Sequence, residues 1–362
     1  MSILIFLVVL FVLVLVHELG HFLVAKWVGM RVDEFGIGFP PKALSIRNGE
    51  TEYALNILPI GGYVKIYGED PTADVSADSA RAFGSKSRLA QAAVLIAGVT
   101  MNVLFAWILF LAVFLIGVPT SVSEDASSDA ATLTVAGVVA DGPAAEAGIV
   151  PGADIVRVTA GGDELASLTP SAFAIFTHTH ADKELAITYI LNDEEVTAFV
   201  TPQTEVIADD PTQPAVGVAL SLVETVRYSI GEAVIEATDA TFSSLVAITV
   251  GISSLIADAV TFEADLSGVA GPIGIVGMVE DAADFGLTSL LLFTAMISLN
   301  LAIINLLPVP ALDGGRLIFV AIESVIRRPL NPVWAGRANL VGFGLLMVLM
   351  LAVTYNDILR II

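Results

Sequence analysis

The sequence contains no cysteine, which excludes disulfide bridges and thiolate metal ligands. A zinc site in this chain must therefore be built from histidine and carboxylate side chains. Basic residues are also scarce, because 16 Lys and Arg stand against 38 Asp and Glu, and the formal net charge is −22. Such an acidic surface does not suit nucleic acid, so we expect no nucleic-acid partner.

The few basic residues are unevenly spread along the chain. Only three lie between 119 and 290, where 26 residues are acidic, whereas eight lie between 26 and 88 and four between 316 and 337. Cytoplasmic loops of membrane proteins carry an excess of Lys and Arg. We therefore expect 26–88 and 316–337 to face the cytoplasm, and 119–290 and both termini to lie outside.

Long apolar runs make the chain a candidate membrane protein. Hydrophobic residues are 56% of the sequence and the mean hydropathy is +0.83. A helix needs about 20 apolar residues to cross a bilayer, and four segments approach this length: 1–25, 89–118, 287–307 and 337–354. Residues 244–260 are apolar but contain Asp258, so we expect them at the membrane interface. The first run has neither a basic start nor a cleavage site, which favours a retained membrane helix over a signal peptide.

Three polar residues interrupt the first apolar run. His17, Glu18 and His21 form an H-E-x-x-H pattern, which on a helix puts both imidazoles on one face, with the glutamate beside them. The pattern predicts a metal site in which Glu18 takes a proton from water. Ionisable side chains inside a membrane segment are costly and indicate function. The alternative is a hydrogen-bonded pair of core histidines.

A catalytic zinc needs a third protein ligand, for which Asp313 is the best candidate. It follows Asn305-Leu-Leu-Pro-Val-Pro-Ala-Leu at the expected cytoplasmic end of the third span. The first helix should also carry His17 and His21 near its cytoplasmic end. Gly314 and Gly315 would allow a close backbone approach, and Asn305 can hydrogen-bond a substrate backbone. The alternative for Asp313 is a helix cap.

The remaining segments predict smaller elements. Gly36 and Gly38, with the prolines after them, exclude a helix, and we expect short strands at 43–47 and 52–58 around an Asn48-Gly49 turn. A further strand is expected from Pro59, and a flexible connection over 69–87. Such a sheet offers an edge to an extended peptide, although an ordinary loop is equally compatible. Asn102, inside the second run, suits either a helix–helix hydrogen bond or contact with a substrate.

Residues 132–217 have a soluble pattern of strands and short helices after a linker at 121–130. A strand at 132–139 is followed by Gly142-Pro-Ala-Ala-Glu-Ala-Gly148, a helix at 168–180, a hairpin of 184–190 and 195–201 around Asn192-Asp193, and a strand from Val216. The arrangement resembles a PDZ domain of the permuted bacterial type. His178 and His180 are expected at its surface. Residues 222–262 alternate acidic and apolar positions, which predicts one or two amphipathic helices on the outer membrane face.

Taken with the H-E-x-x-H pattern and Asp313, these features resemble the site-2 protease family of intramembrane zinc metalloproteases. The resemblance implies that His17, His21 and Asp313 bind one zinc ion per chain, that Glu18 is catalytic, and that Asn102, Asn305, Gly36 and Gly38 contact the substrate. It also implies an integral membrane protein of the cell membrane that cleaves a transmembrane protein, such as a membrane-anchored regulator, near the cytoplasmic side of the lipid bilayer. Val99 and Arg316 depart from residues common in the family, proline and histidine, but neither is a metal position.

The expected fold is a four-span α-helical membrane protein with a membrane-associated β-hairpin and an extracytoplasmic PDZ-like α+β domain. Its parts are 1–28 (first span), 29–88 (β segment and loop), 89–118 (second span), 131–221 (PDZ-like domain), 222–286 (amphipathic helices), 287–316 (third span) and 337–359 (fourth span). Two other functions compete with the protease. A catalytically inactive, membrane-anchored PDZ scaffold predicts a missing ligand or glutamate, and an ion transporter predicts more ionisable residues within the spans.

Overall fold

The computed structural model describes residues 2–69, 78–126, 128, 130–191, 194–206, 212–261 and 269–361. Among the expected features, the connection at 69–87 and the turn at Asn192-Asp193 fall wholly or partly outside them. The chain divides into two compact units. One comprises Met1–Ala112 with Glu232–Ile362, and the other Val113–Gly231.

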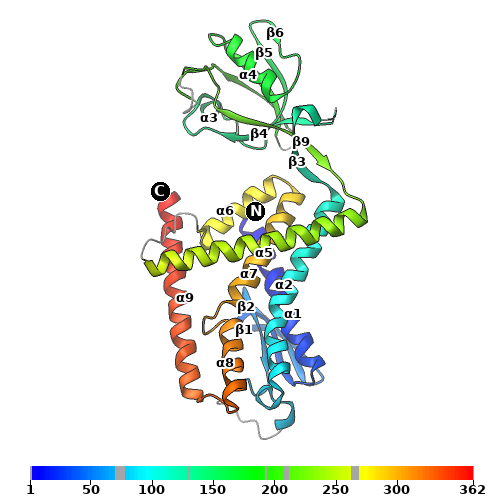
Figure 1. Cartoon of the computed structure of the whole chain (residues 1–362), viewed down its shortest axis with the longest axis vertical. Coiled ribbons are helices and arrows are strands. Elements are labelled where there is room, and N and C mark those ends of the chain that lie inside the picture. Colours follow the sequence, from blue (N-terminus) through cyan, green and yellow to red (C-terminus); the bar gives the residue numbers. More distant parts are fainter. Residues whose placement is uncertain are drawn as a thin grey trace. The chain divides into compact units, whose positions relative to one another are not determined.

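The first unit is built from long apolar helices, drawn in Figure 1. Five helices of the described chain are long and apolar enough to cross a membrane by length and composition. They are α1 (Ser2–Trp27), α2 (Arg88–Ile116), α5 (Ile230–Thr261), α7 (Leu287–Leu306) and α9 (Pro332–Ile361). Four of them correspond to the expected spans. The fifth, α5, is one continuous helix where one or two interfacial helices were expected, and it hydrogen-bonds to α2 through Trp107 and Thr238.

A curled two-stranded sheet lies against α1 (Figure 1). β1 (Val32–Asn48) and β2 (Thr51–Ile66) pair antiparallel. The end of β1 pairs with the start of β2 across the expected Asn48-Gly49 turn, and Val32–Ile37 pair with the segment from Gly62 to Ile66. The strands expected at 43–47, at 52–58 and from Pro59 lie within β1 and β2, but β1 begins earlier than expected, at Val32. Gly38, at φ +78°, bends β1 without ending it.

The third expected span ends earlier than its predicted limit of 316. α7 stops at Leu306, before Pro308, and α8 (Asp313–Ile326) begins after a short turn. A Cβ atom at Gly314 would collide with the carbonyl oxygens of Leu306 and Leu307. Only glycine therefore lets α8 start this close to the end of α7, and that approach fixes the position of Asp313.

α6 (Pro272–Asp284) is anchored by the C-terminal helix. Asp357 of α9, which is 2% exposed, accepts hydrogen bonds from the backbone N–H groups of Gly271 (3.0 Å) and Gly274 (2.9 Å). The carboxylate thus satisfies N–H groups that a helix start leaves without partners inside the helix. Val279 and Ala282 of α6 are buried.

The described part of the second unit is an antiparallel sheet with the two α-helices α3 and α4. The strand order is β3-β9-β4-β5-β7-β8, and β6 pairs with β5. Its core contains Leu133, Ile155, Val158 and Ile187, all at most 3% exposed. The bounds are β3 (Val118–Val122), β4 (Thr132–Val138), α3 (Pro143–Glu146), β5 (Asp154–Ala160), β6 (Asp163–Glu164), α4 (Pro170–Thr179), β7 (Leu185–Leu191), β8 (Glu194–Val200) and β9 (Val218–Val226).

Most strands predicted in 132–217 are present, with three differences. β9 continues to Val226, so the amphipathic helix does not begin at 222. The segment expected to be a linker from 121 begins inside a strand, because β3 pairs with β9 from Val118 to Val122. His180 is buried rather than at the surface. It contacts the Phe176 carbonyl oxygen and the Asp163 carboxylate.

Candidate metal centre

α1 brings His17, Glu18 and His21 to the wall of one cavity. Helical spacing of four residues puts both imidazoles on one face of α1, and their ring centroids lie 4.8 Å apart, edge to face. Both histidines are 8% exposed, whereas Glu18 is half-buried. The apolar residues before this motif carry the helix without a break.

The carboxylate of Asp313, at the start of α8, completes a triangle with the two imidazoles. His17 Nε2 and His21 Nε2 are 3.1 Å apart, and each lies 3.1–3.2 Å from Asp313 Oδ2. A tetrahedral zinc ion with bonds of about 2.0–2.1 Å holds its ligands about 3.3 Å apart. The two nitrogens and the oxygen therefore fit three corners of a zinc tetrahedron and leave the fourth corner open.

α2 packs directly against the two histidines. The Val94 carbonyl oxygen is 2.8 Å from His21 Nδ1, and the Asn102 side-chain amide is 3.2 Å from His17 Nδ1. Between them, a Cβ atom at Gly98 would lie 2.7 Å from the Cε1 atoms of both imidazoles and closer still to His21 Nε2. The absence of a side chain at Gly98 is thus what allows α2 to approach the site.

The cavity has a volume of about 260 Å³, and β2 forms one of its walls. Gly62, Tyr63, Val64 and Ile66 line it. A Cβ atom at Gly62 would lie only 3.1 Å from Glu18 Cγ, so the catalytic candidate rests against the strand backbone. Asn305 at the end of α7 also lines the cavity. Residues of five elements, α1, α2, β2, α7 and α8, therefore converge there.

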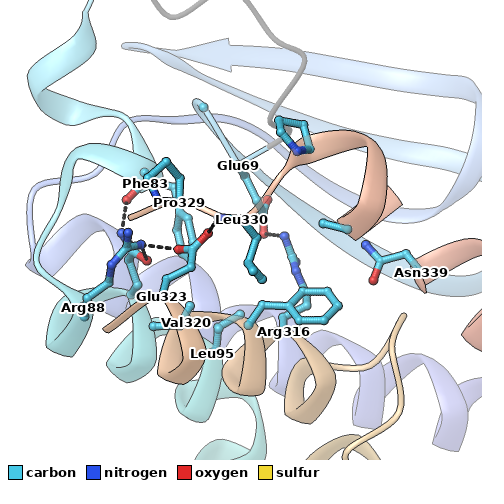
Figure 2. Close-up of a pocket in the computed structure, with 16 residues that line it drawn as sticks. Glu69, Phe83, Arg88, Leu95, Arg316, Val320, Glu323, Pro329, Leu330 and Asn339 are labelled. Carbon is cyan, nitrogen blue, oxygen red and sulfur yellow. Dashed lines mark hydrogen bonds and ion pairs between the residues drawn. The ribbon is translucent and has the colours of Figure 1, made fainter. Parts of the chain in front are cut away.

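A second cavity of about 350 Å³ adjoins the first, and the two share Glu69, Leu95 and Arg316. The Arg316 guanidinium lies 2.6 Å from the Glu69 carboxylate, and Figure 2 shows this ion pair in the cavity wall. A second pair, Arg88 with Glu323, is also 2.6 Å apart. Each cation in these walls is therefore matched by an anion.

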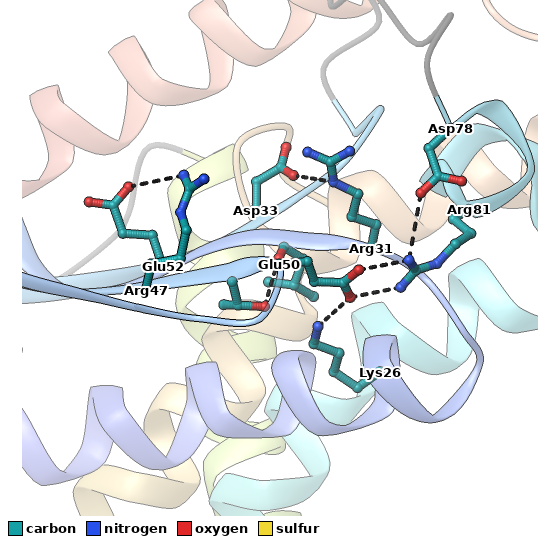
Figure 3. A network of polar contacts seen from close by, with 10 residues as sticks. Lys26, Arg31, Asp33, Arg47, Glu50, Glu52, Asp78 and Arg81 are labelled. Carbon is teal, nitrogen blue, oxygen red and sulfur yellow. Dashed lines mark hydrogen bonds and ion pairs between the residues drawn. The ribbon is translucent and has the colours of Figure 1, made fainter.

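A charged network ties the end of α1 to the β1–β2 turn (Figure 3). Glu50 accepts hydrogen bonds from Lys26 Nζ at 2.6 Å and from both terminal nitrogens of Arg81 at 2.7 Å. The Arg81 guanidinium, followed by Lys26, lowers the pKa of Glu50 to about 2. The network holds the curled sheet beside the helix that carries the histidines.

The predicted site residues fall into three groups in the structure. His17, Glu18, His21, Asn305 and Asp313 all line the smaller cavity. Asn102 is 0% exposed and lies behind His17, outside the cavity lining. Gly36 and Gly38 do not line the cavity either. Gly36 packs under the Tyr63 ring, where a Cβ atom would collide with it, and Gly38 packs against the Leu58 carbonyl oxygen.

Sequence reasoning missed Gly62 of β2 and Val94 and Gly98 of α2, which line or support the site. Gly62 had a signal, since Gly61-Gly62 interrupts an apolar strand, and such glycines often mark a close backbone approach. Gly98 had a similar signal, four residues before Asn102 in an apolar helix. The Glu69–Arg316 pair had none, because 247 positions separate its members.

Comparisons with known proteins agree on one family. The model of peptidase family M50 matches residues 5–349. The chain is 36% identical to a Clostridium perfringens protein named as a candidate zinc metalloprotease, over 96% of this chain and 95% of that protein. It is 29% identical to the regulator of sigma-W protease RasP of Bacillus subtilis, over 98% of both chains. It is also 30% identical to the zinc metalloprotease RasP of Bacillus licheniformis, again over 98% of both.

Proposed function

Because this chain belongs to peptidase family M50 and is a membrane zinc metalloprotease, we propose that it hydrolyses a peptide bond within the membrane-spanning part of a protein substrate. The observation that carries the proposal is the triangle of His17, His21 and Asp313 beside Glu18. Two of its ligands belong to an apolar helix that is long enough to cross a bilayer. A single zinc ion per chain is the stoichiometry that one such triangle supports.

Glu18 is the group that we assign to proton transfer. Its carboxylate lines the same cavity as the three ligands, so it can take a proton from water and pass it to the leaving amine. A bound zinc ion would supply Lewis acidity toward the scissile carbonyl and the attacking water. His17, His21 and Asp313 would hold that ion, and the Gly62 backbone behind Glu18 would limit the directions in which its side chain can turn.

An extended substrate fits the wall formed by β2. Peptide bonds in a helix are shielded by their own hydrogen bonds, so the substrate must unwind before it is cut. Residues 62–66 of β2 pair on one side with 32–37 of β1, and no strand of the described chain pairs with their other side. That free edge is suited to strand addition. Asn305 would hydrogen-bond the substrate backbone, while Gly36 and Gly38 would act indirectly by shaping the sheet.

The second unit is proposed to select substrates. We keep the assignment of a PDZ-like domain, which an apolar cavity of about 210 Å³ between α4 and β9 supports as a docking site. The charge distribution supports an orientation with this unit and both termini outside and with the metal site toward the cytoplasm. Since one relative is named a regulator of sigma-W protease, a membrane-anchored regulator is the substrate class that we propose. The four-span topology also remains a proposal, with α5 at the interface.

The test uses the full chain with a model single-span substrate and measures both cleavage and zinc content. Glu18→Gln should abolish cleavage and keep the zinc, because only the proton carrier is lost. Glu236→Gln, on α5 and away from the cavity lining, is the matched control and should cleave normally. Cleavage by Glu18→Gln would remove Glu18 from its role. A wild-type chain that binds its substrate without cutting it would favour the inactive scaffold.

A further inference from the structure

Three positions of α2, spaced four residues apart, face the two imidazoles. Val94 presents its carbonyl oxygen to His21, Gly98 leaves room for both rings, and Asn102 presents its amide to His17. Equal spacing of four residues follows one face of a helix. The same face of α2 therefore contacts both candidate metal ligands, and its Val94 end also lines the cavity.

The contact with Val94 fixes which ring nitrogen of His21 carries the proton. A backbone carbonyl can only accept, so Nδ1 must carry the hydrogen at 2.8 Å. In the neutral ring, Nε2 is then left with its lone pair directed at the triangle. Partners of this kind orient metal-binding histidines and fix the tautomer.

His17 needs the same arrangement if its Nε2 is to bind zinc. Its Nδ1 must then carry the hydrogen, so the partner at 3.2 Å must accept. The oxygen and nitrogen of an asparagine amide are interchangeable by a half-turn of the side chain. In the orientation with Nδ2 toward His17, the Asn102 Oδ1 atom is buried and has no hydrogen-bond partner among the described residues. The half-turn gives this oxygen the His17 N–H as its donor.

From this geometry we infer that Asn102 is a positioning residue that holds His17 in its zinc-binding tautomer, and that it does not contact the substrate. It is 0% exposed and outside the cavity lining. A hydrogen bond of 2.8 Å from Ser298 Oγ to the Asn102 carbonyl oxygen ties this turn of α2 to α7. The inference rests on the zinc site of the proposed function and adds a partner to its ligand shell.

The experiment measures the zinc affinity of the full-length chain in detergent by competition with a chelator. Asn102→Ala should bind zinc about 10- to 100-fold more weakly, the usual effect of removing such a partner. Asn102→Asp should bind at least as tightly as the wild type, because a carboxylate also accepts from the imidazole N–H. Asn300→Ala is the matched control. Among the described residues its side chain bonds only to the Met296 carbonyl oxygen of its own helix, and the substitution should leave zinc affinity unchanged.

Two outcomes would overturn the inference. In one, Asn102→Ala binds zinc as tightly as the wild type, which would make Asn102 a helix-packing residue. In the other, Asn102→Asp loses zinc as Asn102→Ala does. Should Asn102→Ala fail to fold, the Asn102→Asp result decides alone. Failure of the proposed function is distinguishable, because the wild-type chain would then hold no zinc or Asp313→Asn would hold it as tightly as the wild type.

Discussion

The close approach of α2 to the histidines makes Gly98→Ala a demanding test of the metal site. The added methyl would lie 2.7 Å from the Cε1 atoms of His17 and His21, whereas ordinary carbon contacts begin near 3.5 Å. Relief requires a movement of at least about 0.8 Å by the rings or by the helix, because His21 Nε2 lies closer still to the added methyl. The rings are held by Val94 and Asn102 on their Nδ1 sides, so the movement must break these bonds or separate the helices. Overpacking of this kind typically costs about 1–3 kcal/mol.

Zinc–ligand distances in a well-formed site lie within about 0.2 Å of their usual values. We therefore expect Gly98→Ala to lose at least about tenfold in zinc affinity, measured by chelator competition, together with a lower unfolding temperature. Gly344→Ala on α9 is the control, because its Cβ atom would meet no atom of the described residues within 4 Å. Alanine should stabilise that helix by about 0.5–1 kcal/mol. Wild-type zinc affinity in Gly98→Ala would refute the packing of α2 against the imidazoles.

Three further predictions concern charged groups other than the candidate metal ligands and Glu18. Asp357→Ala should lower the free energy of unfolding by about 1–3 kcal/mol, because the N–H groups at the start of α6 lose a buried, charged acceptor; thermal unfolding in detergent measures this. Since the pKa of Glu50 falls to about 2 in the folded chain, its contribution is present above about pH 4.5 and disappears toward pH 2. The stability difference between wild type and Glu50→Gln, at most about 1 kcal/mol for such an exposed pair, should vanish over that range. Glu69→Gln and Arg316→Gln should each lower the free energy of unfolding, and the double mutant should lose less than the sum of the two single losses. Additive losses would exclude a direct ion pair.

Local patterns explain why part of the site was predictable. The spacing of His17 and His21 fixes their shared face within a single helix, so no knowledge of the fold is needed. The prediction of Asp313 as the third ligand required one further step. The charge-based topology put this residue on the same side as the two histidines, and its carboxylate stands alone in an apolar stretch. The structure places its Oδ2 atom 3.1 Å from His17 Nε2, although 296 positions separate the two residues.

Longer-range packing explains what the sequence did not reveal. The strand pairing of Val118–Val122 with Leu222–Val226 joins segments about a hundred residues apart, and neither segment signals the other. β1 extends through Gly36 and Gly38 because a paired partner supplies the hydrogen bonds that local propensity does not favour. Asn102 was identified as important, but whether it faces a substrate or a histidine depends on the rotation of α2, which apolar periodicity alone does not fix.

X-ray absorption at the zinc edge of the full-length wild-type chain tests the joint ligation by His17, His21 and Asp313 most directly. We expect one zinc ion per chain with nitrogen and oxygen neighbours at about 2.0–2.1 Å and the outer-shell scattering of two imidazoles. Asp313→Asn should weaken binding and change this spectrum. A spectrum with three imidazoles, or one that Asp313→Asn leaves unchanged, would contradict the convergence of α1 and α8 on a single metal ion.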